Sequence, residues 1–439
     1  MSHRTLFLCL CLFGLLVGTA CQQAPTAADQ PLIAPTAEVS TVTPLTLYIA
    51  SRQGNISKGL VLAAERWEAQ TGINIEIEEY AYTYLQEQIF IDVQRNTSKY
   101  DVILIDDPWF PSLAGNGYLV PLSAFSYAAD PDFLQRSLEL GMWPPPEGPR
   151  HPYLDPRKRS ELYALPLVGN VQMFWYRNDL IDPPTDLTEM AAVLNEAADI
   201  PSGLYPYAYT GGAGNPVVTE FSAWNWAYGG EIFDQNWRVV LDQPASIRAL
   251  TDMVSLAQTS LPASTLFRSS RDAGEAVLQG KAIASMIWPS HITELSQGQV
   301  PANMTITTFP GEVTSASQMG HWLLAVPVTA PHKQEAFNFI MWATSPEMMK
   351  AAVYEGVAPT RHSVFQDAEL TSRYPWILTA EESIQNARWR PRTPEWPSVE
   401  YILGNYLNQA LDGHITPEEA LLSAKADIER LMEAAGYYD

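Results

Sequence analysis

The chain has only three cysteines in 439 residues, and two of them, Cys9 and Cys11, lie among the first twenty. Basic residues are also scarce, because 26 Lys and Arg stand against 49 Asp and Glu and give a net charge of −23. Nucleic acid and anionic membrane surfaces repel so acidic a protein, so neither is expected to be a partner. The longest apolar run, Leu6 to Val17, is too short to span a bilayer comfortably.

The start of the chain has the pattern of an export signal. His3 and Arg4 precede the apolar run, and small residues at 18–20 lead directly into Cys21. A cysteine at this junction resembles the lipobox of bacterial lipoproteins, in which the thiol receives a diacylglyceryl group and becomes the mature N-terminus. The sequence departs from that pattern at Gly18, where Leu is usual. An ordinary secretory signal is the alternative.

Removal of this signal would leave Cys21 as the only cysteine, so no intramolecular disulfide can form and stability must come from core burial. The composition fits a globular protein, since 46% of the residues are apolar and 17% are charged. Residues 22–44 contain mainly Ala, Pro, Thr and Gln, which cannot build a core. We therefore assign residues 1–20 to a lipoprotein signal peptide and 21–44 to a flexible tether.

After the tether, strand and helix patterns alternate. Leu45–Ile49 alternates like a strand, a helix that Ser57 can cap follows, and another helix is predicted over Tyr82–Arg95. The apolar run Asp101–Ile105 is typical of a buried parallel strand. This alternation predicts an α/β fold with doubly wound sheets, whose ligands bind beyond the carboxyl ends of the strands. The polar segments 51–55 and 106–109 follow two of these ends.

Several longer motifs then occur in a specific order. They are WEAQTG at 67–72, YDVI at 100–103, GYLVPL at 117–122, FWYRNDL at 174–180, GKAIASM at 280–286, GHWLLAV at 320–326 and RPRTPEW at 390–396. In this order, and over nearly the whole mature chain, they resemble the extracellular solute-binding proteins of ABC importers. The similarity is to family 1, the maltose-binding-protein-like sugar-binding group.

The resemblance implies the type II periplasmic-binding-protein fold. Two α/β lobes, each with a doubly wound mixed sheet, would be joined by crossover strands around a ligand cleft. Matching positions place the N-terminal lobe at 45–168 plus 323–362 and the C-terminal lobe at 169–322 plus 363–439. Such proteins close around the solute by hinge bending. We expect Gly169 and Gly320, near two crossovers, to absorb the backbone rotation.

The aromatic content supports a carbohydrate ligand independently of the resemblance. The chain has 13 Trp and 20 Tyr, and sugars lie on flat aromatic rings while their hydroxyls bind amide, carboxylate and guanidinium groups. Trp288 stands at a predicted strand end, and Trp396 stands in a Pro-flanked loop where Trp389 competes for the same role. Of Asp106 and Asp107, one can cap the helix that starts at Pro108 while the other binds hydroxyls, or both can act as caps.

Together, local pattern and family match give a set of candidate ligand-binding residues. Core packing is the alternative interpretation of its aromatic members, above all of Trp109, Trp224 and Trp322. The set is Arg52, Gln53, Asp107, Trp109, Asn170, Tyr207, Tyr209, Trp224, Trp288, Trp322 and Trp396.

Motifs of the main enzyme classes are missing from the sequence. It has no His-Glu-x-x-His and no Gly-x-Ser-x-Gly, and Gly274 to Lys281 resembles a phosphate loop only loosely. We predict no catalysis, no cofactor and no metal.

The predicted function is that of an exported, lipid-anchored receptor in the periplasm or on the cell surface. It would act as a monomer and deliver a sugar or polyol to the permease subunits of an ABC importer. The alternatives are a surface glycoside hydrolase and a binding protein for a phosphorylated polyol or a peptide.

Overall fold

The structure, a computed structural model, describes residues 44–259, 266–267, 269–296, 299–315 and 317–438. The predicted signal peptide, Cys21 and nearly all of the predicted tether lie outside the described residues. Among the described helices, none is both long and apolar enough to cross a membrane.

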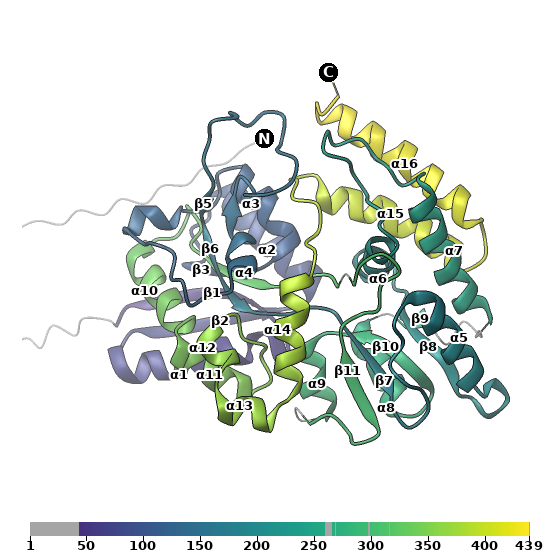
Figure 1. Cartoon of the computed structure of the whole chain (residues 1–439). Helices are drawn as coiled ribbons and strands as arrows, with labels where there is room; N and C mark the ends of the chain where they lie inside the picture. Colours follow the sequence, from purple (N-terminus) through teal and green to yellow (C-terminus); the bar gives the residue numbers. More distant parts are fainter. Residues whose placement is uncertain (1–43, 260–265, 268, 297–298, 316, 439) are drawn as a thin grey trace, which may run out of the picture. The chain divides into compact units, whose positions relative to one another are not determined.

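Two mixed sheets organise the described chain (Figure 1). The first sheet has the order β2 (Asn74–Tyr80), β1 (Thr46–Arg52), β3 (Val102–Asp106), β12 (Trp322–Ala325) and β6 (Ala164–Val168). Strand β1 pairs in parallel with β2 and β3, whereas β12 runs antiparallel to β3 and β6. All five residues of β3 are buried, as expected of a strand covered on both faces.

The second sheet is also mixed. Its order is β11 (Met304–Thr307), β7 (Met173–Arg177), β10 (Ala282–Ile287), β8 (Tyr205–Thr210) and β9 (Leu266–Phe267). Strand β10 pairs in parallel with β8 and antiparallel with β7. Two lobes with mixed sheets confirm the predicted fold class. We call the elements packed around the first sheet the first lobe and those around the second sheet the second lobe.

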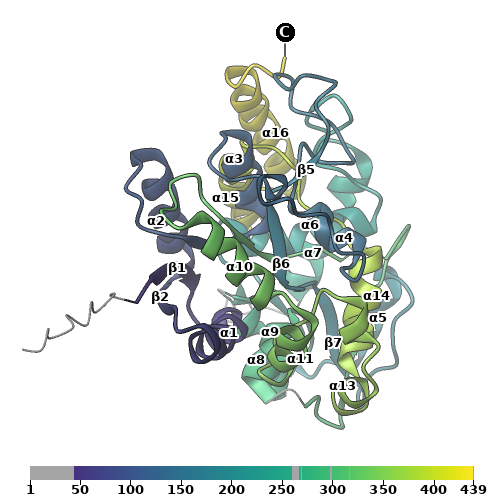
Figure 2. The same cartoon turned by 90° about the vertical axis from the view of Figure 1, so that its left-hand side faces the viewer.

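Helices surround both sheets (Figures 1 and 2). Those of the first lobe are α1 (Asn55–Thr71), α2 (Tyr82–Arg95), α3 (Phe110–Gly115), α4 (Gln135–Glu139), α10 (Lys333–Ala343), α11 (Pro346–Tyr354), α12 (His362–Phe365) and α13 (Ala368–Arg373). Those of the second lobe are α5 (Leu187–Ala197), α6 (Asn215–Ala227), α7 (Pro244–Thr259), α8 (Ser270–Leu278), α9 (Pro289–Ser296), α15 (Trp396–Leu411) and α16 (Pro417–Ala434). Helix α14 (Trp376–Asn386) contacts α4 as well as β7 and β11, so it packs against both lobes. The boundaries given above for the lobes remain a prediction.

Three extended segments pass side by side between the lobes. Gln172 N donates to Gln318 O, and Gly320 N donates to Asn170 O, each at 2.9 Å. Arg388 lies beside Gln318 in a parallel bridge. Gly169 and Gly320 are needed here for close approach, not for a left-handed backbone. A Cβ at residue 169 would lie 2.1 Å from Pro359 O, and a Cβ at residue 320 would meet Trp288.

The predictions for individual helices and strands were confirmed in part. The helix over Tyr82–Arg95 is observed with those bounds, and the strand predicted over Asp101–Ile105 is β3, shifted by one residue. The capping role of Ser57 was wrong, because α1 already begins at Asn55. The Ser57 hydroxyl instead donates to Gly54 O and bonds with Glu79.

Candidate functional site

The ends of the parallel strands meet around one cavity. Strands β1, β3 and β8 end at Arg52, Asp106 and Thr210, and β10 ends immediately before Trp288. In a parallel pair, the carboxyl ends of both strands lie at the same edge of the sheet, which is where ligands bind in folds of this type. Because both lobes direct such an edge toward the cavity, its walls come from both.

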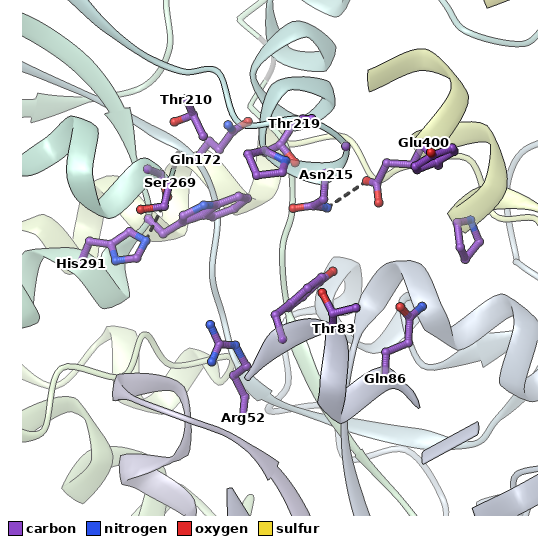
Figure 3. Close-up of a pocket in the computed structure, with 18 residues that line it drawn as sticks. Arg52, Thr83, Gln86, Gln172, Thr210, Asn215, Thr219, Ser269, His291 and Glu400 are labelled. Carbon is purple, nitrogen blue, oxygen red and sulfur yellow. Dashed lines mark hydrogen bonds between the residues drawn. The ribbon is translucent and has the colours of Figure 1, made fainter. Parts of the chain in front are cut away.

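The cavity consists of two adjacent spaces that share five lining residues, and we call them the outer and the inner chamber. The outer chamber, of about 600 Å³, is lined by Arg52, Tyr82, Thr83 and Gln86 of the first lobe and by Gln172, Thr210, Ala213, Gly214, Asn215, Pro216, Thr219, Ser269, Ser270, Trp288, His291, Pro397, Glu400 and Tyr401. Figure 3 shows Arg52, Thr83 and Gln86 on one side, facing Asn215 and Glu400 on the other. The inner chamber, of about 160 Å³, shares Arg52, Tyr82, Asn215, Trp288 and His291 and adds Ile56, Asp106, Asn170, Ser290, Gly320, Trp322 and Arg390.

Aromatic rings form much of the inner chamber. The Tyr82 ring lies 4.8 Å from that of Trp109 and 6.1 Å from that of Trp322, measured between centroids. Tyr82 and Trp322 reach the chamber, whereas Trp109 packs behind them and is buried. Trp288 is half-buried and borders both chambers. Its indole packs directly against the crossover backbone at Gly320. A Cβ at residue 320 would lie 2.7 Å from Cη2 and Cζ3 of Trp288.

The acidic groups at the base of the site are paired with arginines. Arg390 Nη2 lies 2.7 Å from Asp107 Oδ2 and 3.6 Å from Asp106 Oδ1, and Tyr82 Oη donates to Asp106 Oδ2 at 2.8 Å. Burial raises the pKa of the Asp106 carboxyl, and Arg390 opposes that rise. Burial by itself would lower the pKa of the Arg390 guanidinium, but the nearby charges of Asp107, Asp106 and Glu400 together outweigh it and raise that pKa.

Charges around the cavity nearly balance. The carboxyl groups of Asp106, Asp107 and Glu400 face three guanidinium groups, those of Arg52, Arg390 and Arg392. Glu400 Oε1 accepts from Asn215 Nδ2 at 2.9 Å, drawn as a dashed line in Figure 3. A site with paired charges of both signs offers no excess of positive charge to an anionic ligand.

Of the buried polar atoms that have no hydrogen-bond partner among the described residues, three belong to cavity-lining side chains of the crossover segments. They are Asn170 Oδ1, Gln172 Oε1 and Arg390 Nε, and the three residues are only 3–4% exposed. Leaving such an atom unpaired costs about 1–3 kcal/mol. Each of the three has almost no accessible surface, so a ligand supplies the partner only if the side chain turns toward the cavity. Two of the atoms accept hydrogen bonds and one donates.

His321 fixes the crossover beside Asn170. Its Nδ1 lies 2.9 Å from Asn170 O and its Nε2 lies 2.8 Å from Ser137 Oγ. Burial lowers the pKa of the His321 imidazole to about 4, so the ring is neutral at neutral pH. The neutral tautomer with the proton on Nδ1 can donate to the carbonyl and accept from the hydroxyl, which holds Asn170 in place.

The structure divides the eleven candidate residues predicted from the sequence. Arg52, Asn170, Trp288 and Trp322 line the cavity. Gln53 is exposed and lines neither chamber. Asp107 and Trp109 are buried directly behind the inner chamber, and it is Asp106, not Asp107, that reaches it.

Four aromatic candidates belong to the core of the second lobe instead. Tyr207, Tyr209, Trp224 and Trp396 are fully buried there. Tyr207 and Tyr209 occupy one face of β8 and pack against each other and against Trp224 of α6. Trp396 is the first residue of α15 and not part of a loop, and its ring turns into the core while Pro397 and Glu400 reach the cavity.

Other lining residues were not in the predicted set, although Asp106 was considered beside Asp107. Tyr82, Asp106, Gln172, Asn215, Arg390 and Glu400 come from six separate segments. A signal existed for Arg390, because the RPR motif at 390–392 is conspicuous in so acidic a chain and buried arginines require carboxylate partners. Asn215 and Glu400 had no such signal, since their pairing depends on how α6 packs against α15.

The fold and the interlobe cavity define a two-lobed protein that binds ligand between its lobes. The family model of the bacterial extracellular solute-binding proteins matches residues 53–350. The chain belongs to this family, which confirms the predicted resemblance and a substrate-binding role. The described residues contain no group of three or more His, Cys, Asp or Glu side chains that could hold a metal ion.

Individual relatives are distant. A mannitol-binding protein of Pseudomonas aeruginosa is 25% identical over 390 residues, which cover 80% of this chain and 85% of the relative. A periplasmic-binding protein of Sinorhizobium fredii, named for an amino-acid ABC transporter, is 23% identical over 381 residues and 84% of each chain. A solute-binding protein of Agrobacterium radiobacter K84 solved in complex with ribitol has a TM-score of 0.76 and 23% identity, with 88% of this chain and 98% of that chain covered. This structural likeness shows the fold.

Proposed function

We propose that the protein is the substrate-binding component of an ABC importer and that it captures a neutral sugar or polyol between its lobes. It catalyses nothing itself and hands its solute to the permease subunits in the membrane. The observation that carries this proposal is the pairing of charges around a cavity that is lined by several amide side chains.

The chemistry of the cavity supports uncharged hydroxyl groups as the feature recognised. Amide side chains at Gln86, Asn170, Gln172 and Asn215 can both donate to and accept from hydroxyls. Trp288 supplies the flat apolar surface on which the C–H face of a sugar or polyol packs. Two relatives with such ligands in their names, for mannitol and for ribitol, agree with this class.

A phosphorylated polyol fits less well. Arg52 is the only Lys or Arg among the residues that line the outer chamber, and in the inner chamber Arg390 is already engaged by Asp107 and Asp106. A phosphate carries about −1.5 to −2 charges at neutral pH and would require further cations.

A thermal-shift screen tests the proposal directly. Mannitol, ribitol, common monosaccharides, maltose, a phosphorylated alditol and a set of amino acids would each be added to the mature protein. A ligand that binds only the folded state at a hundred times its dissociation constant stabilises it by about 2.7 kcal/mol, so the melting temperature should rise with a neutral hydroxylated compound. A rise with amino acids alone would favour the other relative's named class and contradict the proposal.

If the protein were a glycoside hydrolase, it would release smaller sugars from oligosaccharides. Asp106 and Glu400 both line the cavity, so carboxyl groups are available in principle. We expect no cleavage when maltose and longer oligosaccharides are incubated with the protein and analysed by chromatography. Release of smaller sugars above the level of a buffer control would show catalysis and overturn this part of the proposal.

We further propose export and anchoring through a lipid on Cys21, with the protein acting as a monomer at the outer side of the membrane. Replacing Cys21 with Ser removes the only thiol left after cleavage and should release the protein into the soluble fraction. Partition of the variant into detergent at the level of the parent protein would contradict lipid attachment.

A further inference from the structure

A second cavity lies apart from the cleft between the lobes. Its volume is about 320 Å³, within the roughly 300–1,000 Å³ of pockets that hold small molecules. Its walls come from residues 147–149, from Trp226 near the end of α6, from residues 231–237 and from the crossover segment 388–392. Among the described residues, none lines both this cavity and a chamber of the cleft. We call it the aromatic pocket.

Aromatic side chains define the aromatic pocket, and they are those of Trp226, Phe233, Trp237 and Trp389. The rings of Phe233 and Trp237 pack edge to face with their centroids 5.4 Å apart. Trp237 Nε1 also donates to Arg150 O at 2.8 Å, which fixes this pair of rings. Rings held in this way offer flat faces to a ligand without having to be ordered first.

Two of the rings already face a positive charge. The guanidinium carbon of Arg388 lies 5.2 Å from the ring centroid of Trp226, and that of Arg136 lies 4.1 Å from the ring centroid of Trp389. A cation within about 6 Å of a ring centroid is attracted by the electron-rich face of the ring, most strongly for tryptophan. The pocket is therefore built from rings of the kind that binds cations.

Three carboxyl groups line the same pocket, those of Glu147, Glu231 and Asp234. Arg388 pairs with Glu231, whereas Asp234 forms no ion pair among the described residues. Asp234 Oδ1 accepts from the backbone N–H groups of residues 236 and 238, each at 2.8 Å. Arg238 lies over the ring of Tyr438 and does not line the pocket. The charge of Asp234 is thus left without a matching cation.

The other arginines nearby do not restore the balance. Arg136 Nη1 lies 3.2 Å from Glu147 Oε2 and 3.6 Å from Glu139 Oε2, so one guanidinium group serves two carboxyl groups. Arg392 lines the pocket, but it donates to Asp107 O and Leu140 O, and its charge belongs to the cluster at the base of the cleft. Carboxyl groups therefore outnumber guanidinium groups around the rings, and the pocket attracts positive charge.

We propose that the aromatic pocket is a second binding site, separate from the cleft, for a small organic cation: an ammonium or guanidinium compound with an apolar body. Its positive group lies against the ring faces and near Asp234, and its body removes water from Ile232 and Phe233. An anion meets an excess of carboxyl groups, and a neutral compound gains the apolar contacts alone. This inference does not depend on which solute binds in the cleft.

Calorimetric titration of benzyltrimethylammonium into the mature protein tests the site, with benzyl alcohol as an uncharged compound that carries the same ring. The cation should bind about tenfold more tightly than the alcohol, because only the cation is attracted by the ring faces and the carboxyl groups. Trp389→Leu keeps an apolar wall but removes a ring face, and Asp234→Asn removes a charge but keeps the acceptor for the turn. Each variant should weaken binding of the cation about fivefold.

Two matched variants show where the cation binds. Trp288→Ala removes a ring from the cleft, and Asp182→Asn removes an exposed charge that lines neither the cleft nor the aromatic pocket. Both should bind the cation like the wild type. Weaker binding in Trp288→Ala would place the cation in the cleft and overturn the proposal.

Three further results would also overturn it. They are absence of saturable binding of the cation, equal affinity for the cation and the alcohol, and wild-type affinity in both Trp389→Leu and Asp234→Asn. The melting temperature of each variant shows whether it is folded, and Asp234→Asn keeps the test decisive if Trp389→Leu fails to fold.

Discussion

Asp106 and Asp107 are adjacent in the chain, yet their carboxyl groups have different surroundings. The Asp106 side chain accepts from Asp107 N, caps the short helix at Asp107–Trp109 and borders the inner chamber. Asp107 is fully buried and holds Arg390, while Arg392 Nη1 donates to its backbone oxygen at 3.0 Å. Asp107 thus positions the arginine that completes the chamber wall without contacting the cavity itself.

Removing the charge of Asp107 should therefore affect stability as well as binding. Asp107→Asn leaves Arg390 buried with a weaker partner, and breaking one side of a buried ion pair costs about 3–5 kcal/mol. Urea unfolding should show this loss in the free energy of unfolding. The matched control is Asp155→Asn, whose ion pair with Arg157 lies on the surface and should contribute little. Equal stability of the two variants would contradict a structural role for Asp107.

At the scale of helices and strands, the sequence predicted those elements whose pattern of apolar residues is local to the element. Helix α2 was predicted with its observed bounds and β3 within one residue, because apolar spacing alone defines them. The position of the site at the strand ends also followed, since it depends on parallel order and not on side-chain detail. Arg52 and Trp288, two of the predicted candidates, line the cavity for this reason.

The sequence was less informative where packing between elements decides which side chains face the core. Tyr207 and Tyr209 are two residues apart and therefore share one face of β8, but this spacing cannot tell which face a helix covers. Helix α6 covers that face, so both rings join the core, and only Thr210 at the end of the strand reaches the cavity. Trp396 was misplaced similarly, because its flanking prolines suggested a loop where α15 begins.

Helix α6 also carries a buried carboxyl that makes stability depend on pH. Glu220 is fully buried and accepts from Tyr207 Oη at 2.7 Å, and burial raises the pKa of its carboxyl to about 7. The folded state keeps this proton up to about pH 7, whereas an unfolded chain releases it near its ordinary pKa of 4.5. Its contribution to stability is present at low pH and is lost as the pH rises through 7.

Glu220→Gln should remove this dependence while keeping an acceptor for Tyr207. The free energy of unfolding of the variant relative to the wild type should rise by about 3 kcal/mol between pH 4.5 and pH 8. Denaturant unfolding across that range measures the difference, and other titrating groups such as Asp106 cancel because both proteins contain them. A difference that does not change with pH would show that the pKa of Glu220 is not raised in the folded state.

At the scale of the molecule, the two lobes are linked more extensively than by a hinge alone. Besides the three crossovers, the segment between β4 (Met142–Trp143) and β5 (Glu161–Leu162) reaches the second lobe, where Trp237 Nε1 donates to Arg150 O at 2.8 Å. Tyr438 Oη in turn donates to Trp237 O at 2.8 Å, so the end of the chain joins this contact. Motion of one lobe against the other must accommodate these links.

The cavity is built from both lobes, so a ligand gains most when both contact it at once. Binding then shifts the population toward the arrangement with both walls in contact, by as much as its affinities for the two arrangements differ. Small-angle scattering of the mature protein should show a smaller radius of gyration at saturating solute than without it. Trp288→Ala removes a wall shared by both chambers and should need a higher solute concentration to reach the same radius. A radius that stays constant at saturation would mean that the links between the lobes hold the site in one arrangement, and capture by closure would have to be abandoned.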